Sequence, residues 1–348
     1  MKLRICSSLL IVLASLSLLG AEVPKRDLEA DNKAAFAAID KMKVGINMGN
    51  ALDAPTEGAW GWKLEADDFR LVHEAGFQAI RLPVRWAAHA EGKAPYTISP
   101  DFFKRVDWAL EQARLNQLSV VMDIHHFEPL MADPAAHREQ LMALWEQIAR
   151  HYAGYENWLL FEILNEPTEK LTDELWNEFL VEALAVIRKS NPNRVVVIGP
   201  GTWNCLGSLP KLKLPENDRL LAVTLHYYAP FQFTHQGAFW IKDAEKWQGK
   251  TWRGTPEEKA EIRKDFDQAA AWSKANRRPI YLGEFGANDK ADMESRACWT
   301  RFIREEANAR GMAVAYWEFC AYFGAYDRQA KTWRQPLLEA LVGEKSKK

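Results

Sequence analysis

The sequence is poor in cysteine, and the few cysteines that it has are not spaced to hold a fold together. Four occur among 348 residues, and Cys6 lies in the apolar segment that opens the chain. The other three, Cys205, Cys298 and Cys320, allow at most one disulfide bond, and no C-x-x-C pair or zinc-type spacing is present. The sequence therefore excludes a disulfide scaffold and a zinc-finger protein.

An excess of charge of one sign is also missing. The chain has 45 Lys and Arg against 47 Asp and Glu, a net charge of -2 and a pI near 6.5. Nucleic-acid binding depends on a positive surface, so this balance predicts no nucleic-acid partner. No low-complexity linker divides the chain, and we therefore expect one catalytic domain over 22–348.

The one long apolar run stands at the N-terminus. MKLR is a short basic start, ICSSLLIVLASLSLLGA is apolar, and EVPKRD is abruptly polar. This pattern is typical of a secretory signal peptide over residues 1–21, cleaved near Gly20 or Ala21, and it predicts a secreted or periplasmic protein with no membrane association after cleavage. The alternative is an uncleaved membrane anchor, for which the run is short and contains four serines.

Eight short β-rich runs alternate with longer stretches of helical period. The runs are 44–50, 79–86, 119–126, 158–167, 194–201, 220–228, 279–286 and 312–319, and the helical stretches include 101–116, 172–190, 291–310 and a closing helix at 335–343. Ser99 or Asp101, and Thr172, are candidate N-caps. Eight such units predict the α/β class and a (β/α)8 TIM barrel. A doubly wound open sheet would usually show G-x-G-x-x-G after the first strand, and the sequence there is GINMGNALDAP.

Ionisable, amide or aromatic side chains stand near the carboxyl ends of seven of these runs, where barrel enzymes have their active sites. They are Asn47, Asn50, Arg81, Arg85, His125, His126, Asn165, Glu166, His226, Tyr228, Glu284 and Trp317. The 15 tryptophans offer flat apolar faces, some of them suited to sugar rings and others to the core.

Two carboxylates in this set suggest the chemistry. Glu166 follows the fourth run and Glu284 the seventh, so both can project across the mouth of the barrel. Glycoside hydrolysis needs one protonated carboxyl and one ionised carboxylate that face each other across a bond, about 5 Å apart when the reaction retains the anomeric configuration. The sequence therefore predicts a glycosidase.

The neighbouring residues suggest which carboxyl takes which part. Tyr228 could hold an ionised Glu284, and His226, two positions before it on the same strand face, could tune Glu166. Arg81 would stabilise a negative nucleophile. Asn165 could bind a hydroxyl of the sugar that is cleaved.

Six segments, IRLPVRW, DIHH, FEILNEP, TLHYY, YLGEFG and AYWEF, occur in this order at the strand ends. Together they resemble the signature of glycoside hydrolase family 5 of clan A, over roughly residues 40 to 343. INMGNALDAP, THQGAFW and WEFCAYFGAYD are similar to the branch of bacterial endo-β-1,4-glucanases that also accept mannan.

The resemblance implies that Glu166 is the general acid/base and Glu284 the nucleophile of an endo-β-1,4-glucanase (cellulase) that needs no metal or other cofactor. The remaining implied site residues are Arg81, His125, Asn165, His226 and Tyr228, with Trp317 under a sugar, Asn50 as a glycone contact, Asp53 where the branch has Glu, and His126, His235 and Trp240 lining the cleft. His235 and Trp240 lie in the insertion 229–255, a candidate substrate loop or a solvated flap. The implied partner is a β-linked polysaccharide or oligosaccharide, and we expect a monomer.

Three alternatives remain open. The first is an endo-β-1,4-mannanase or a bifunctional enzyme, since glucose and mannose differ only at the C2 hydroxyl. The second is a catalytically inactive barrel that binds polysaccharide. The third is a metal-dependent hydrolase, prompted by His125 and His126, but adjacent residues of a strand point to opposite faces, which argues against it.

Overall fold

The structure, a computed structural model, describes residues 26–343. The predicted signal peptide, residues 1–21, lies outside the described residues. Among residues 26–343, no helix is long and apolar enough to cross a membrane.

Eight parallel strands form one closed barrel in chain order, as predicted. The strands are β1 (Val44–Asn47), β2 (Ala79–Leu82), β3 (Ser119–Asp123), β4 (Leu159–Glu162), β5 (Val196–Ile198), β6 (Leu221–His226), β7 (Ile280–Phe285) and β8 (Ala313–Tyr316). Each is shorter than the run that predicts it, because the ladder of hydrogen bonds ends before the run does. Glu166, expected at the strand tip, therefore lies in the loop that follows β4.

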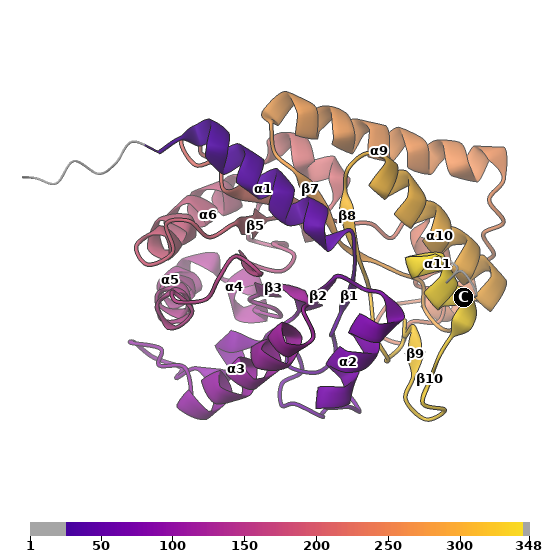
Figure 1. Cartoon of the computed structure of the whole chain (residues 1–348), viewed down its shortest axis with the longest axis horizontal. Coiled ribbons are helices and arrows are strands. Elements are labelled where there is room, and N and C mark those ends of the chain that lie inside the picture. The colour runs from indigo at the N-terminus through magenta and orange to yellow at the C-terminus, as the bar shows by residue number, and fades with distance from the viewer. Residues whose placement is uncertain (1–25, 344–348) are drawn as a thin grey trace, which may run out of the picture.

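Helices surround the strands (Figure 1). The helices are α1 (Leu28–Met42), α2 (Ala66–Ala75), α3 (Pro100–Leu115), α4 (Glu128–Ala132), α5 (Pro134–His151), α6 (Asp173–Arg188), α7 (Gly201–Asn204), α8 (Phe231–Thr234), α9 (Pro256–Asn276), α10 (Met293–Ala309) and α11 (Gln335–Val342), with 3-10 turns η1 (Trp86–His89), η2 (Leu206–Lys211) and η3 (Ala244–Trp247). A small hairpin of β9 (Tyr326–Asp327) and β10 (Thr332–Trp333) precedes α11.

The predicted helix starts follow from capping. Ser99 caps α3 by accepting a hydrogen bond from the backbone N–H of Phe102, and Thr172 caps α6 by accepting one from Leu175. These bonds satisfy N–H groups that the first turn of a helix leaves without a partner. Both cap predictions are confirmed, with Ser99 rather than Asp101 as the cap of α3.

The barrel interior is apolar at its amino end and polar at its carboxyl end. Ala79 of β2 and Leu160 of β4 belong to a buried cluster that also contains Ile39 of α1. Side chains two positions further along a strand share the same face, which places Arg81 and Glu162 one layer above. Helix α1 contacts β6 and β8, so the amino end is covered and the polar layer faces the other way.

Strands β6 and β7 are irregular beside the predicted nucleophile. The register between them shifts at Leu225 and His226, and His226 pairs with Glu284. Gly283 is required here, because a Cβ on it would lie 2.3 Å from the Oγ1 of Thr224. Such irregularities reorient side chains next to functional sites.

Candidate active site

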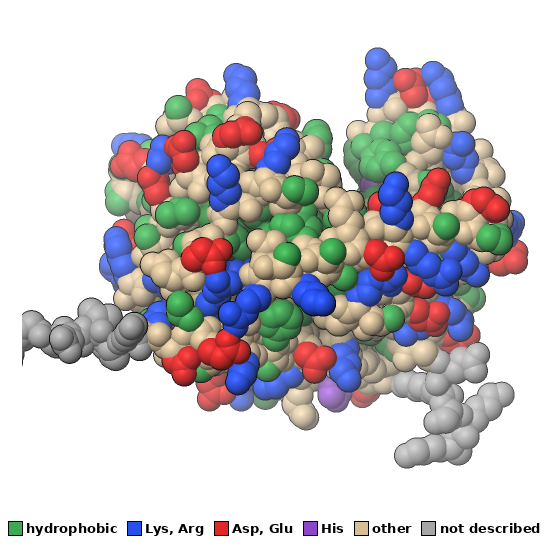
Figure 2. Space-filling view, turned by 90° about the horizontal axis from the view of Figure 1, so that it is seen from above, with side chains coloured by type: hydrophobic (Ala, Val, Ile, Leu, Met, Phe, Trp, Pro, Cys, Tyr) green, Lys and Arg blue, Asp and Glu red, His purple; other side chains and the backbone are tan. Residues whose placement is uncertain are grey.

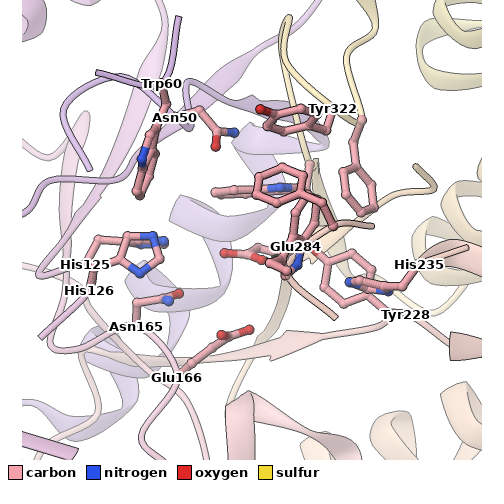
Figure 3. A pocket seen from close by; sticks show the side chains of 14 residues that line it. Asn50, Trp60, His125, His126, Asn165, Glu166, Tyr228, His235, Glu284 and Tyr322 are labelled. Atoms are coloured by element: carbon pink, nitrogen blue, oxygen red, sulfur yellow. Dashed lines mark hydrogen bonds between the residues drawn. The ribbon is translucent and has the colours of Figure 1, made fainter. Parts of the chain in front are cut away.

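A cleft opens at the carboxyl ends of the strands, with a volume of about 420 Å³. Figure 2 shows a deep notch in the molecular outline with hydrophobic side chains on one wall. The residues that line the cleft (Figure 3) are Asn50, Trp60, His125, His126, Asn165, Glu166, Tyr228, His235, Phe239, Trp240, Glu284, Trp317, Tyr322 and Phe323. Ten of the thirteen predicted site residues are therefore among them, and Asp53, Arg81 and His226 are not.

Arg81 lies beneath the cleft and shares its positive charge among three carboxylates. Its guanidinium donates two hydrogen bonds to Glu162, at 2.7 and 2.8 Å, and one to Glu284 at 2.7 Å. It also pairs with Asp123 at 2.7 Å and donates to the Oδ1 of Asn165 at 2.8 Å. All five groups are buried or nearly so, and a planar guanidinium can hold several acceptors at fixed positions. Arg81 therefore positions the site rather than contacting the cleft.

Glu284 accepts hydrogen bonds on both carboxylate oxygens. Arg81 donates to Oε1 at 2.7 Å, and the hydroxyl of Tyr228 donates to Oε2 at 2.8 Å. Burial raises the pKa of Glu284, and the charge of Arg81 and the Tyr228 hydrogen bond act in the opposite direction. Two donors on the carboxylate stabilise its ionised form.

Glu166 has a different environment. Its Oε1 lies 2.7 Å from Nδ1 of His226, and the amide nitrogen of Asn204 lies 3.3 Å from the other ring nitrogen. An amide that donates to Nε2 places the ring proton on Nδ1, which then donates to Glu166. Burial raises the pKa of Glu166 to about 7, and the negative charge of Glu162 adds to this effect. About a quarter of the Glu166 side chain (27%) stays exposed to the cleft.

The two carboxyls lie close together. A carboxylate oxygen of Glu166, a ring nitrogen of His226 and a carboxylate oxygen of Glu284 all lie within 4.8 Å of one another. A sugar bond can therefore lie between two carboxyls whose surroundings differ.

The turns after β3 and β4 direct neighbouring side chains into the same cleft. Glu166 and His126 both have positive φ, 49° and 51°, which breaks the alternation of an extended strand. As a result Asn165 lies beside Glu166, and His125 beside His126, in the lining (Figure 3). The expectation that His125 and His126 point to opposite faces was wrong. Strand β3 ends at Asp123, so the alternation of side chains along a strand does not apply to these two residues.

Asp53 lies behind the cleft rather than in its lining. It is completely buried, and its carboxylate accepts hydrogen bonds from the backbone N–H groups of Asn50 and Ala51, at 3.0 and 2.8 Å. It therefore fixes the turn that presents Asn50. Donor atoms of Asp53, His125 and His126 lie within 4.8 Å of one another, a set chemically able to hold a metal ion.

Trp317 is one of the residues that line the cleft. Its ring is parallel to that of His125, with an interplanar angle of 4° and centroids 5.8 Å apart. Gly49 makes room for it, because a Cβ on Gly49 would lie 2.6 Å from the indole. The position and orientation suit a sugar platform.

Four aromatic or apolar lining residues were not predicted: Trp60, Phe239, Tyr322 and Phe323. Their positions depend on contacts between loops that are far apart in the sequence. The one available signal was the position of Phe239 beside Trp240 in the insertion 229–255. That insertion is an ordered loop with helix α8 and turn η3, and the Gln236 side chain bonds the backbone of Phe233, Gly249 and Lys250 across it.

The sequence profile of the cellulase family, glycosyl hydrolase family 5, matches residues 41–322. The chain belongs to this family. Among characterised relatives, Endoglucanase H of Acetivibrio thermocellus is 36% identical over 316 residues, which are 88% of this chain and 33% of that protein. Cellulase/esterase CelE of the same organism is 29% identical over 88% of this chain and 40% of that protein. The chain thus spans a third to two fifths of the length of these two relatives.

Solved structures of the family superpose closely on this one. Thermotoga maritima Cel5A, solved in complex with mannotriose and with cellobiose, is 48% identical with a TM-score of 0.87, and the match covers 88% of this chain and 100% of that one. A hyperthermophilic endo-beta-1,4-glucanase in complex with substrate is 43% identical with a TM-score of 0.86, over 89% of this chain and 99% of that one.

Proposed function

We propose that this protein is a retaining endo-β-1,4-glucanase that cleaves β-1,4-glucans such as carboxymethylcellulose, mixed-linkage β-glucan and glucomannan. The observation that carries the proposal is the pair of carboxyls, Glu166 and Glu284, with oxygens within 4.8 Å of each other. A separation of about 5 Å leaves no room for a water between carboxyl and sugar, which favours double displacement over inversion.

The hydrogen bonds assign the two roles. Glu284 receives a guanidinium and a phenol hydroxyl, so its ionised form is the better stabilised, and it acts as the nucleophile. Glu166 has a pKa raised to about 7 and receives one neutral imidazole on Oε1, so it keeps a proton near neutral pH and acts as the acid. The Oε2 of Glu166 is then the atom that faces the leaving oxygen.

The reaction proceeds in two displacements. Glu284 attacks C1 while the proton of Glu166 moves to the glycosidic oxygen, so the C1–O bond breaks and a glycosyl ester forms on Glu284. Glu166, now ionised, takes a proton from water, and the water oxygen displaces Glu284 from C1 with net retention. Arg81 holds the Oδ1 of Asn165, which leaves the amide N–H groups for a sugar hydroxyl.

Glucan is the substrate class that the relatives favour, since several of them are endoglucanases and one solved neighbour binds cellobiose. A mannan substrate is the second candidate, because the same 48%-identical neighbour is also solved with mannotriose. The inactive polysaccharide-binding barrel is disfavoured by the two carboxyls and their hydrogen-bond partners. Secretion and a monomeric state belong to the same proposal.

The test is the release of reducing ends from carboxymethylcellulose, mixed-linkage β-glucan, glucomannan and galactomannan. Glu166→Ala and Glu284→Gln are the controls: both should leave the fold intact, Glu284→Gln should abolish measurable turnover, and Glu166→Ala should lower it by about 10² to 10⁴. Activity on galactomannan equal to that on the glucans would make the enzyme bifunctional. No activity on any of the four, or a folded and fully active Glu284→Gln variant, would contradict the proposal.

A further inference from the structure

We infer that Phe239, Trp240 and Tyr322 form an additional sugar-binding subsite at the rim of the cleft. This subsite binds a pyranose unit of the same β-1,4-linked chain that is cleaved at Glu284. The inference rests on the proposed function. It adds to that function the residues that determine how strongly kcat/KM increases with the length of the substrate. We call this set, together with Phe323 below it, the aromatic wall.

The three outer rings are exposed and packed on one another. Phe239 is 75% exposed, Trp240 45% and Tyr322 40%. Their ring centroids lie 4.9 Å apart for Phe239 and Trp240, 5.1 Å for Phe239 and Tyr322, and 5.5 Å for Trp240 and Tyr322. Soluble proteins rarely leave such a group of aromatic side chains in water unless it binds something.

The aromatic wall continues into the catalytic site. Trp240 contacts Phe323 at 6.1 Å between centroids, and Phe323 contacts Tyr228 at 6.2 Å and His235 at 5.4 Å. Tyr228 in turn donates its hydroxyl to Glu284. An unbroken series of ring contacts therefore leads from the nucleophile to the exposed rim, all within the lining of one cleft.

The aromatic wall is held in place before any ligand arrives. The buried carboxylate of Glu318 accepts hydrogen bonds from the backbone N–H groups of Cys320, Ala321 and Phe323, at 2.8 to 3.1 Å. The carbonyl of Tyr322 accepts a hydrogen bond from the N–H of Asp289 at 2.8 Å, which ties the loop after β8 to the loop after β7. A preorganised surface loses little conformational entropy on binding, so its contacts contribute to affinity.

The occupant follows from the position of the aromatic wall. The flat C–H faces of a β-1,4-linked pyranose match aromatic rings, and a chain that passes between Glu166 and Glu284 reaches the rim without leaving the cleft. His126, Asn50 and Trp60 line the cleft on the other side of Glu284 (Figure 3), and of the aromatic wall only Trp240 was predicted as a lining residue.

The test compares chain lengths. For wild type and for Phe239→Ala/Tyr322→Ala, kcat/KM is measured on cellotriose, cellotetraose, cellopentaose and cellohexaose. In the double variant, the ratio of kcat/KM for cellohexaose to that for cellotriose should fall about tenfold, mainly through KM, because aromatic contacts of this kind are each worth up to about one decade. Calorimetry on variants that also carry Glu284→Gln, and so cannot cleave the ligand, should show a similar loss of affinity for cellohexaose.

The matched control is Phe36→Ala, which removes an exposed aromatic side chain (40%) from α1 at the covered amino end of the barrel. It should leave the chain-length ratio at the wild-type value, and the ring-preserving variants Phe239→Tyr and Tyr322→Phe should do the same. If the double variant does not fold, Phe239→Ala alone carries the test, since this side chain is largely in solvent.

Two results would overturn the inference: an unchanged ratio in the folded double variant, or a dimer in wild type that the double variant converts to a monomer. Failure of the proposed function is a different result, in which wild type itself cleaves no cello-oligosaccharide of any length.

Discussion

At the scale of single residues, the chemistry of this site depends on the unequal partners of two glutamates. Glu284 is fixed between Arg81 and Tyr228, while Glu166 has His226 as its one hydrogen-bond partner among residues 26–343 and keeps part of its surface in the cleft. Desolvation raises the pKa of both, but only Glu284 has a full positive charge in contact with it. These unequal environments support the proposed assignment of Glu166 as the acid and Glu284 as the nucleophile.

The raised pKa of Glu166 predicts the alkaline limb of the pH profile. Because the acid form of Glu166 is the active one, kcat/KM on cello-oligosaccharides should fall as the pH rises through about 7. A 2,4-dinitrophenyl cellobioside, whose leaving group needs no proton, is the control, and its glycosylation step should lose this limb. The same alkaline limb on both substrates would contradict the assignment of Glu166 as the acid.

Replacing Glu166 by alanine gives the second prediction. Turnover of cello-oligosaccharides should fall by about 10² to 10⁴, the usual contribution of a general acid/base. Sodium azide should restore turnover of the dinitrophenyl substrate and give a β-glycosyl azide, because the small anion can attack the glycosyl ester where the base is missing. An inverted azide product would place the missing carboxylate on the other face of the sugar and reverse the two roles.

At the scale of elements, Arg81 of β2 joins β3, β4 and β7 through the carboxylates that these strands carry at their upper layer. Removing it leaves buried negative charges without a counter-charge. Arg81→Met should therefore lower the free energy of unfolding by about 3–5 kcal/mol, measured by urea denaturation at pH 8. Arg114→Met is the control, since its exposed pair with Glu111 is screened by solvent and its removal should change the free energy of unfolding much less.

The loss of unfolding free energy that Arg81→Met causes should also depend on pH. Burial already raises the pKa of Asp123 to about 6 and that of Glu162 above its usual value. Without Arg81, both pKa values rise further, so the folded variant binds protons that the unfolded chain releases, and its stability falls as the pH rises. The destabilisation should be smaller at pH 5 than at pH 8, and a pH-independent loss would contradict this account.

Much of the architecture could be predicted from the sequence because it depends on local pattern. Alternating apolar runs and helical stretches identify all eight strands, and Thr172 identifies the start of α6 by a bond three residues away. The position of Asp53 could not be predicted, since a carboxylate after the first strand serves equally well as a sugar contact or as an acceptor for backbone N–H groups. The positive φ values of His126 and Glu166 are likewise set by the turn and not by residue type.

At the scale of the whole molecule, a closed barrel covered at its amino end by α1 leaves its carboxyl end for function. Residues from the loops after β1, β3, β4, β6 and β8 meet there around Glu284 of β7, in one cleft of about 420 Å³. The aromatic wall shows the limit of sequence reasoning at this scale, because Trp240 and Tyr322 are 82 positions apart and meet only in the fold.

The central claim is that Glu284 becomes covalently bound to the sugar during each turnover. The direct measurement is mass spectrometry of the protein after incubation with a 2-deoxy-2-fluoro-cellobioside that carries a good leaving group, followed by peptide mapping. We expect one added fluoro-cellobiosyl unit, located on the peptide that contains Glu284 and absent in Glu284→Gln. Turnover of cello-oligosaccharides with the adduct on another carboxylate would contradict it.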